Sequence, residues 1–170
     1  FLTLLSTVFM QAWQFSAVTE SEKDKQEHID FFSKVWSSFQ SIMFLAGSTI
    51  IAFSIPIIKV LTTSDYYSAW LYIPLLSASM IFNSFANFMG SVYVVEKRSK
   101  NSFLTAMLGA VLNIILNLIL IPSPLGVQGA AVGTVAARIF EFCCAAVYMY
   151  FIENKAEADR IAEQVLINKR

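Results

Sequence analysis

Residues 125–141 read LGVQGAAVGTVAARIFE, and this stretch decides the fold class. It follows two prolines, Pro122 and Pro124, and the run continues through Ile152 without another proline, which is a membrane-spanning length. Its length and composition predict a transmembrane helix. Two opposite charges, Arg138 and Glu141, lie near its centre. Ionisable groups at this depth are costly unless they meet a partner or a water-filled cavity.

The composition of the whole chain indicates an integral membrane protein. Hydrophobic residues make up 56% of the 170 residues and charged residues only 14%. Soluble domains are about one-quarter charged, because water must wet their surface. The net charge is zero and no basic stripe is present, so nothing favours nucleic-acid binding.

The apolar runs predict an all-α fold, a polytopic transmembrane helix bundle of about five spans. Because Phe1 begins inside an apolar run and no initiator Met precedes it, we expect a fragment of a longer protein. Residues 1–152 form the predicted bundle, and residues 153–170 form a charged cytoplasmic tail. The predicted spans are residues 1–18, 39–61, 69–95, 103–121 and 127–152.

Residues 19–38 carry the first cluster of charges and are predicted to form a cytoplasmic loop. Apolar residues recur within it at steps of three and four, which is typical of a helix lying at the membrane interface. We expect this helix to precede a turn into the bilayer. Trp36 suits an aromatic anchor at the interface.

The basic residues of the loops predict the orientation of the chain. They fall within residues 19–38, 96–101 and 153–170, whereas residues 62–68 and 122–126 contain none. Basic residues accumulate on the cytoplasmic side. The first span is therefore expected to begin outside and the tail to end inside.

Polar residues recur at intervals of one helical turn on several predicted spans. An amide in lipid is costly unless it bonds to a neighbouring helix or faces water. On the first span, Thr7, Gln11 and Gln14 share one face, and on the third span Ser79, Asn83, Asn87 and Ser91 make a continuous stripe. The candidates for a substrate path are Arg138, Glu141, Thr134, Asn83, Asn87, Asn113, Asn117 and Gln11.

The charge pair allows two interpretations. Arg138 and Glu141 can form a structural pair at positions i and i+3. Alternatively, Arg138 supplies a fixed positive charge for a phosphate or pyrophosphate, since guanidinium donates two parallel hydrogen bonds to phosphate oxygens. The amides would then match sugar hydroxyls, because they both donate and accept. Beside this face, Gly129, Gly133 and Ala137 form a ridge of small residues that we expect to pack against another helix.

The sequence carries no catalytic or metal-binding pattern. It contains no H-E-x-x-H motif, no glycine-rich phosphate loop and no nucleophile elbow. Cys143 and Cys144 are adjacent in an apolar segment and are expected to behave as small hydrophobes. We therefore predict no enzyme, no cofactor and no metal.

Three segments carry a resemblance to a known family. Residues 67–76 read YSAWLYIPLL, residues 97–100 read KRSK, and NIILNLILIP at 113–122 is followed by GVQGAA at 126–131. The asparagine-rich span, the I-P turn and the G-x-x-G-A-A helix opening resemble those of bacterial polysaccharide flippases. These belong to the multidrug, oligosaccharidyl-lipid and polysaccharide exporter superfamily. The resemblance covers about residues 1–152.

The resemblance implies a two-lobe exporter of the bacterial inner membrane that works by alternating access. Its substrate would be an undecaprenyl-diphosphate-linked oligosaccharide, the repeat unit of O-antigen, lipopolysaccharide or exopolysaccharide. The five spans would be the later part of the C-terminal lobe, with the N-terminal lobe elsewhere in the same protein. A cation-coupled multidrug exporter of the same superfamily is an alternative, and it would favour acidic and aromatic cavity residues. A membrane assembly subunit without transport activity is another.

Overall fold

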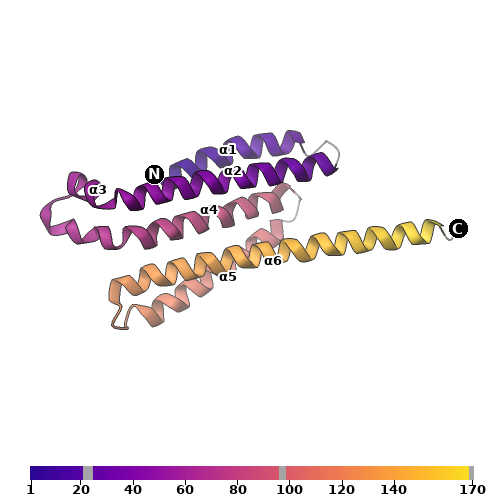
Figure 1. The fold of residues 1–170 in the computed structure, drawn as a ribbon. Coiled ribbons are helices and arrows are strands. Elements are labelled where there is room, and N and C mark those ends of the chain that lie inside the picture. The colour runs from indigo at the N-terminus through magenta and orange to yellow at the C-terminus, as the bar shows by residue number, and fades with distance from the viewer. Residues whose placement is uncertain (21–24, 96–98, 169–170) are drawn as a thin grey trace.

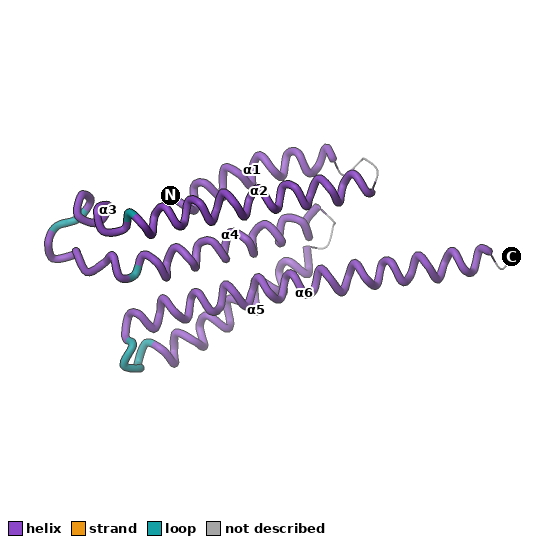
Figure 2. Tube along the Cα trace, viewed as in Figure 1, coloured by secondary structure: helices purple, strands orange, loops and turns teal. Residues whose placement is uncertain are grey.

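The computed structural model describes residues 1–20, 25–95 and 99–168, and its long elements are all helices (Figures 1 and 2). The predicted all-α fold is confirmed for these residues. Parts of the predicted loop at 19–38 and tail at 153–170, namely residues 21–24 and 169–170, lie outside the described residues. The helices are α1 (Leu2–Glu20), α2 (Lys25–Ala52), α3 (Ser54–Leu61), the 3-10 helix η1 (Ser64–Leu71), α4 (Ile73–Val95), α5 (Ser99–Leu120) and α6 (Gly126–Asn168).

Helix α4 lies at the centre of the bundle. Helices α1 and α2 pack on one side of it, and α5 and α6 pack on the other (Figure 1). Helices α5 and α6 are antiparallel and joined by a short turn, and α6 continues well past the other helices to the C-terminal end (Figure 1). Polar side chains on different faces of α4 can therefore meet both sides of the bundle.

Three helices are long and apolar enough to cross a membrane: Asp30–Ala52, Ser99–Leu120 and Gly126–Phe151. A fourth is added if Ser64–Leu71 and Ile73–Val94, which are bent by 52° relative to each other, count as one span. Among the described residues, α1 does not meet this combined requirement of length and apolarity. The structure thus supports three or four of the five predicted spans.

The predicted second span is broken near its proline. Helix α2 ends at Ala52 and α3 begins at Ser54, so Pro56 lies in the first turn of α3. A proline is tolerated there because its missing N–H would have no partner in the helix. Its ring would clash with the carbonyl of Ala52 in a straight helix, which explains the break before it. Pro74 lies in the first turn of α4 in the same way, after the bend from η1.

Trp36 packs against the aromatic core of the bundle. Helix α2 runs without a turn through the segment predicted to be interfacial and into the second span. The Trp36 ring centroid lies 5.0 Å from that of Phe88, 5.2 Å from Phe85 and 6.0 Å from Phe142. The contacts show what Trp36 packs against, and its predicted role as an interfacial anchor stays a prediction. Interfacial helices and helices packed on protein both bury one apolar stripe, so their sequence periods are alike.

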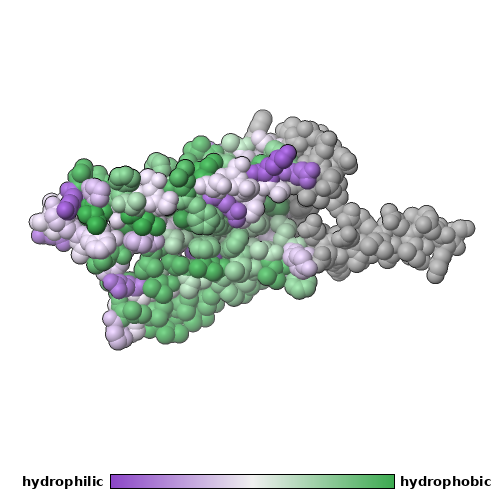
Figure 3. Space-filling view, viewed as in Figure 1, coloured by the Kyte–Doolittle hydropathy of each residue, from purple (hydrophilic) through white to green (hydrophobic). Residues whose placement is uncertain are grey.

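The aromatic core joins both sides of the bundle through α4, and apolar side chains also cover much of the outside. Trp13 of α1 stacks on Phe88, and the Tyr93 hydroxyl of α4 donates to the Ala145 carbonyl of α6. On the outer surface, Leu118 of α5 is 71% exposed and Val127 of α6 is 72% exposed. The hydrophobic residues over α5 and α6 are plain in Figure 3. Exposing this apolar surface to water costs free energy, whereas contact with the hydrocarbon of a bilayer does not.

Candidate functional site

An open polar groove of about 440 Å³ lies between α1, α4, α5 and α6. Its volume falls within the range of sites that bind small molecules. It lies toward the end of the bundle where α1 ends and α5 begins. The polar residues that line this polar groove are Ser6, Thr7, Gln11 and Gln14 of α1, Asn87 and Ser91 of α4, Ser102 and Thr105 of α5, and Glu141 of α6.

Helix α1 forms one wall of the polar groove through the face that the sequence predicted. Thr7, Gln11 and Gln14 all line the groove, because they lie on one side of the helix. On another side of α1, Trp13 is 3% exposed and belongs to the aromatic core. Its Nε1 donates to Ser91 Oγ at 3.1 Å, which fixes α1 to α4 beside the groove.

Helix α4 lines the polar groove with the C-terminal half of its predicted polar stripe. Asn87 and Ser91 line the polar groove, whereas Asn83 is half-buried one turn earlier and does not. Ser79 is 1% exposed, and its hydroxyl has no hydrogen-bond partner among the described residues. Gly90 lies between the two lining residues, and a Cβ there would be 3.1 Å from Ser102 Oγ of α5. The missing side chain thus lets α5 approach α4.

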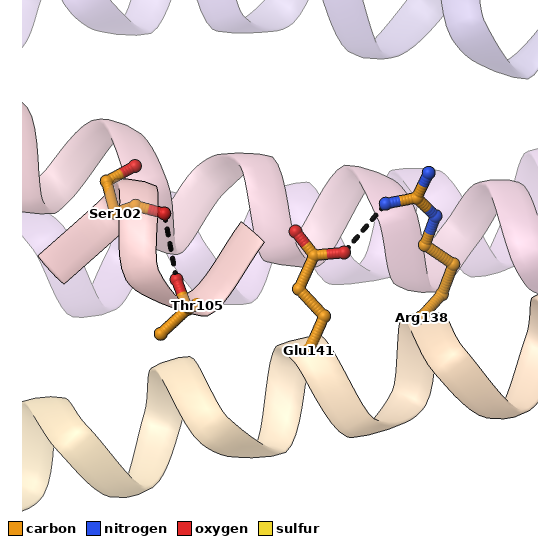
Figure 4. A network of polar contacts seen from close by, with 4 residues as sticks. All are labelled: Ser102, Thr105, Arg138 and Glu141. Carbon is orange, nitrogen blue, oxygen red and sulfur yellow. Dashed lines mark hydrogen bonds and ion pairs between the residues drawn. The ribbon is translucent and has the colours of Figure 1, made fainter. Parts of the chain in front are cut away.

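Helix α6 contributes an ion pair at about the middle of its membrane-spanning part. Arg138 Nη1 lies 2.7 Å from Glu141 Oε2, and both side chains project from the same side of α6 (Figure 4). The Glu141 side chain is 9% exposed and that of Arg138 is 36% exposed. Glu141 lines the polar groove, whereas Arg138 does not. The pair therefore presents its carboxylate to the groove.

Glycine on α5 makes room for this carboxylate. Gly109 is buried and faces Glu141, and a Cβ at Gly109 would lie 2.9 Å from Glu141 Oε2. One turn earlier, the Thr105 hydroxyl lies 3.1 Å from the carbonyl oxygens of both Asn101 and Ser102 (Figure 4). Thr105 thus keeps its hydroxyl close to its own helix beside the groove.

The other predicted candidates lie away from the polar groove. Asn117 Nδ2 donates to Asn113 Oδ1 at 2.9 Å on α5, and Asn117 Oδ1 would lie 3.1 Å from a Cβ at Gly133. Thr134 Oγ1 donates to the carbonyl of Ala130 at 2.8 Å. These contacts lie near the α5–α6 turn, at the other end of the bundle. The two hydrogen bonds lie within α5 and within α6, and none of these residues lines the groove.

The predicted ridge of small residues lies in the contact between α5 and α6. A Cβ at Gly129 would overlap the Leu120 carbonyl oxygen, and one at Gly133 would lie 3.3 Å from Leu116 Cβ. Ala137 is 1% exposed. The backbones of α5 and α6 approach closely here because these residues have small side chains or none.

Three hydroxyl residues that line the polar groove, Ser6, Ser102 and Thr105, were not predicted from the sequence. One of them, Thr105, could have been predicted from its spacing in the sequence. Thr105 lies eight residues before Asn113, so it continues the four-residue spacing of the predicted candidates Asn113 and Asn117. Serines alone carry little information, because a serine hydroxyl is often satisfied by its own helix backbone.

The polar groove offers hydrogen-bonding groups that the protein itself does not use. Among the described residues, no side-chain hydrogen bond satisfies the amides of Gln11, Gln14 and Asn87. Amides donate and accept, and a carboxylate only accepts. The groove can therefore bind an uncharged ligand with many hydroxyl groups.

Comparison of the chain with protein-family models, with curated proteins and with solved structures found no match. Its class therefore rests on the fold and the polar groove alone. Within the ranges that the structure describes, the chain is all-helical, with three helices, or four with the bent pair, that are long and apolar enough to cross a membrane.

Proposed function

We propose that this chain forms part of a transporter that moves lipid-linked oligosaccharides across the bacterial inner membrane by alternating access. The proposed substrate is an undecaprenyl-diphosphate-linked repeat unit used to build surface polysaccharide. The observation that carries the proposal is the polar groove, a volume of about 440 Å³ lined by amides and hydroxyls between otherwise apolar helices.

Free amide side chains between apolar helices are unfavourable in a bilayer unless they face water or a polar ligand. Unsatisfied amides exposed to hydrocarbon cost free energy, so helices that only pack together would bond them to each other. Asn117 donates to Asn113 within α5, whereas Gln11, Gln14 and Asn87 lie together in the groove and have no side-chain partner among the described residues. The gathering of three such amides in one groove favours a path for a polar molecule over packing alone, and so argues against the assembly-subunit alternative.

The place of the groove along the helices suits loading from the cytoplasm. The distribution of basic residues puts the end of α1 and the start of α5 on the cytoplasmic side. Gln14 lies near that end of α1, and Ser102 lies in the first turn of α5. The groove would thus accept the sugars where lipid-linked repeat units are made.

The proposal includes five spans and a second lobe. The groove is open along one side, so a second set of helices, as in the two-lobe proteins that the sequence resembles, would complete the cavity. Rocking of the two lobes would then expose the cavity to one side of the membrane at a time. In this scheme the chain supplies one wall of the substrate path.

A cation-coupled multidrug exporter is the second candidate, and one observation favours it. Glu141, an acidic residue, lines the polar groove, while Arg138 lies outside it. Acidic cavity residues suit binding of cations. The amide and hydroxyl lining suits sugars better than aromatic or cationic drugs, and for this reason the oligosaccharide transporter stands first.

The test uses the whole protein in its own bacterium. Gln11→Leu and Asn87→Leu each replace a free amide with an apolar side chain of similar size, and together they should abolish surface polysaccharide. Gln128→Leu is the matched control, because Gln128 is exposed on α6 outside the groove. The amount of each variant in the membrane is measured in parallel by immunoblotting.

Normal polysaccharide in the double variant, at a normal protein level, would refute the proposal. Loss of drug resistance without loss of polysaccharide would support the exporter alternative.

A further inference from the structure

The polar groove carries one sign of charge. In the part of the chain that the structure describes, Glu141 is the single charged residue of its lining. Arg138 neutralises the pair as a whole, but its guanidinium binds Oε2 and lies outside the lining. A diphosphate placed in the groove would therefore meet the carboxylate before the guanidinium. Like charges at close range in a site with little water repel strongly.

The Glu141 carboxylate has one oxygen left for a ligand. Oε2 accepts the hydrogen bond from Arg138 Nη1 at 2.7 Å. No hydrogen bond within the described residues uses Oε1. In Figure 4 the two carboxylate oxygens diverge, and the second points away from Arg138 on the side of Ser102 and Thr105. Both of these residues line the groove. An ionised carboxylate forms stronger hydrogen bonds than a neutral acceptor, and it requires a donor from the ligand.

Building on the proposed function, we propose that Glu141 recognises the sugar part of the substrate. Its Oε1 accepts a hydrogen bond from a sugar hydroxyl, while the amides of Gln11 and Asn87 bind further hydroxyls. The sugars occupy the polar groove, and the diphosphate lies outside it. Arg138 is a positioning residue, because it holds the other carboxylate oxygen.

The packing around Glu141 and the size of the groove fit this assignment. Gly109 lets Glu141 pack directly against α5, and Gly90 lets Ser102 approach α4. The groove volume of about 440 Å³ suits a ligand of drug-like size, which is the size of a short oligosaccharide. Thr7 and Thr105 keep their hydroxyls on their own helix backbones, so they narrow the groove without demanding a partner.

The proposal is tested by measuring the affinity of the protein for two lipids. The full-length protein in nanodiscs is titrated with undecaprenyl diphosphate carrying the repeat unit, and separately with undecaprenyl diphosphate without sugar. Glu141→Ala should weaken binding of the sugar-bearing lipid by about tenfold or more, since a hydrogen bond to a charged group is lost. Binding of the sugar-free lipid should not change. A merely structural role of Glu141 would weaken both.

The Glu141→Gln variant tests which group of the ligand donates the hydrogen bond to residue 141. A glutamine oxygen still accepts from a hydroxyl, so this variant should lose less affinity than Glu141→Ala. An equal loss of affinity in both variants would rule out a hydroxyl as the donor group of the ligand. It would instead assign an ammonium group as the donor, as on an amino sugar. Because either change leaves Arg138 unpaired, the Arg138→Gln/Glu141→Gln double variant is measured as well. It removes both charges and retains the shape of the pair.

The outcomes separate this inference from the function it rests on. If the unaltered protein binds neither lipid, the proposed function is wrong. If it binds the sugar-bearing lipid and Glu141→Ala binds it equally well, the function stands and the role of Glu141 is wrong. Equal losses for the two lipids would also overturn that role.

Discussion

Gly109 of α5 faces Glu141 of α6 at a distance that leaves no space for a side chain. A Cβ on Gly109 would lie 2.8 Å from Glu141 Cβ and 2.9 Å from its Oε2. Glu141 Cβ is held by its own backbone and cannot turn aside as the end of a flexible side chain could. The position of the carboxylate in the polar groove thus depends on a glycine from another helix.

Gly109→Ala should force α5 and α6 apart or rotate the Glu141 side chain. We expect a loss of about 1–3 kcal/mol in the free energy of unfolding, as for other overpacked sites. Thermal unfolding in detergent measures it, with Ala110→Ser at an exposed neighbouring position as the control. Equal stability of the two variants would contradict the close approach.

Trp13→Phe should retain most of the aromatic packing and remove the hydrogen bond to Ser91 Oγ. The expected cost is about 0.5–1.5 kcal/mol in the free energy of unfolding, the usual net value of one hydrogen bond. Trp70→Phe is the matched control, since Trp70 is 40% exposed on η1. Adding Ser91→Ala to each variant should show coupling with Trp13 and none with Trp70.

Gly129→Ala should destabilise the pair formed by α5 and α6. The new methyl group would overlap the Leu120 carbonyl oxygen, which belongs to the backbone and cannot move alone. A cost of about 1–3 kcal/mol is expected. Ala136→Ser, at an exposed position of the same helix, serves as the control in the same unfolding measurement. A stable Gly129→Ala protein would mean that the two helices are farther apart than described.

The orientation can be tested by labelling single cysteines with a membrane-impermeant maleimide, after Cys143→Ala and Cys144→Ala. Ser68→Cys and Leu125→Cys should react in intact cells, because they lie in the loops without basic residues. Ser99→Cys should react only after the membrane is permeabilised. Labelling of Ser99→Cys in intact cells would reverse the orientation and would remove cytoplasmic loading from the proposed function.

Helix periodicity predicted which residues share a face, but it did not predict which face meets which neighbour. Thr7, Gln11 and Gln14 line the groove together, as their spacing required. Asn83 and Asn87 lie on one stripe as well, yet only Asn87 reaches the groove. Rotation of a helix about its axis is set by packing against other helices, and spacing within one helix carries no record of it.

Trp36 illustrates the same limit. Its sequence neighbours suit both an amphipathic helix on a membrane and a helix packed on protein, since each buries one apolar stripe. The contacts with Phe85, Phe88 and Phe142 come from α4 and α6, which lie far from it along the chain. Contacts of this kind depend on how the whole bundle assembles.

The order of residues alone is sufficient for the helical fold and for placing Arg138 and Glu141 within reach of each other on one helix. These properties are local, because they depend on composition and on separations of three or four residues along one helix. Packing between helices determined that Glu141 rather than Arg138 faces the polar groove, with Gly109 making the space. That choice depends on the rotation of α6 against α5 and α4, which forms only when the three helices come together.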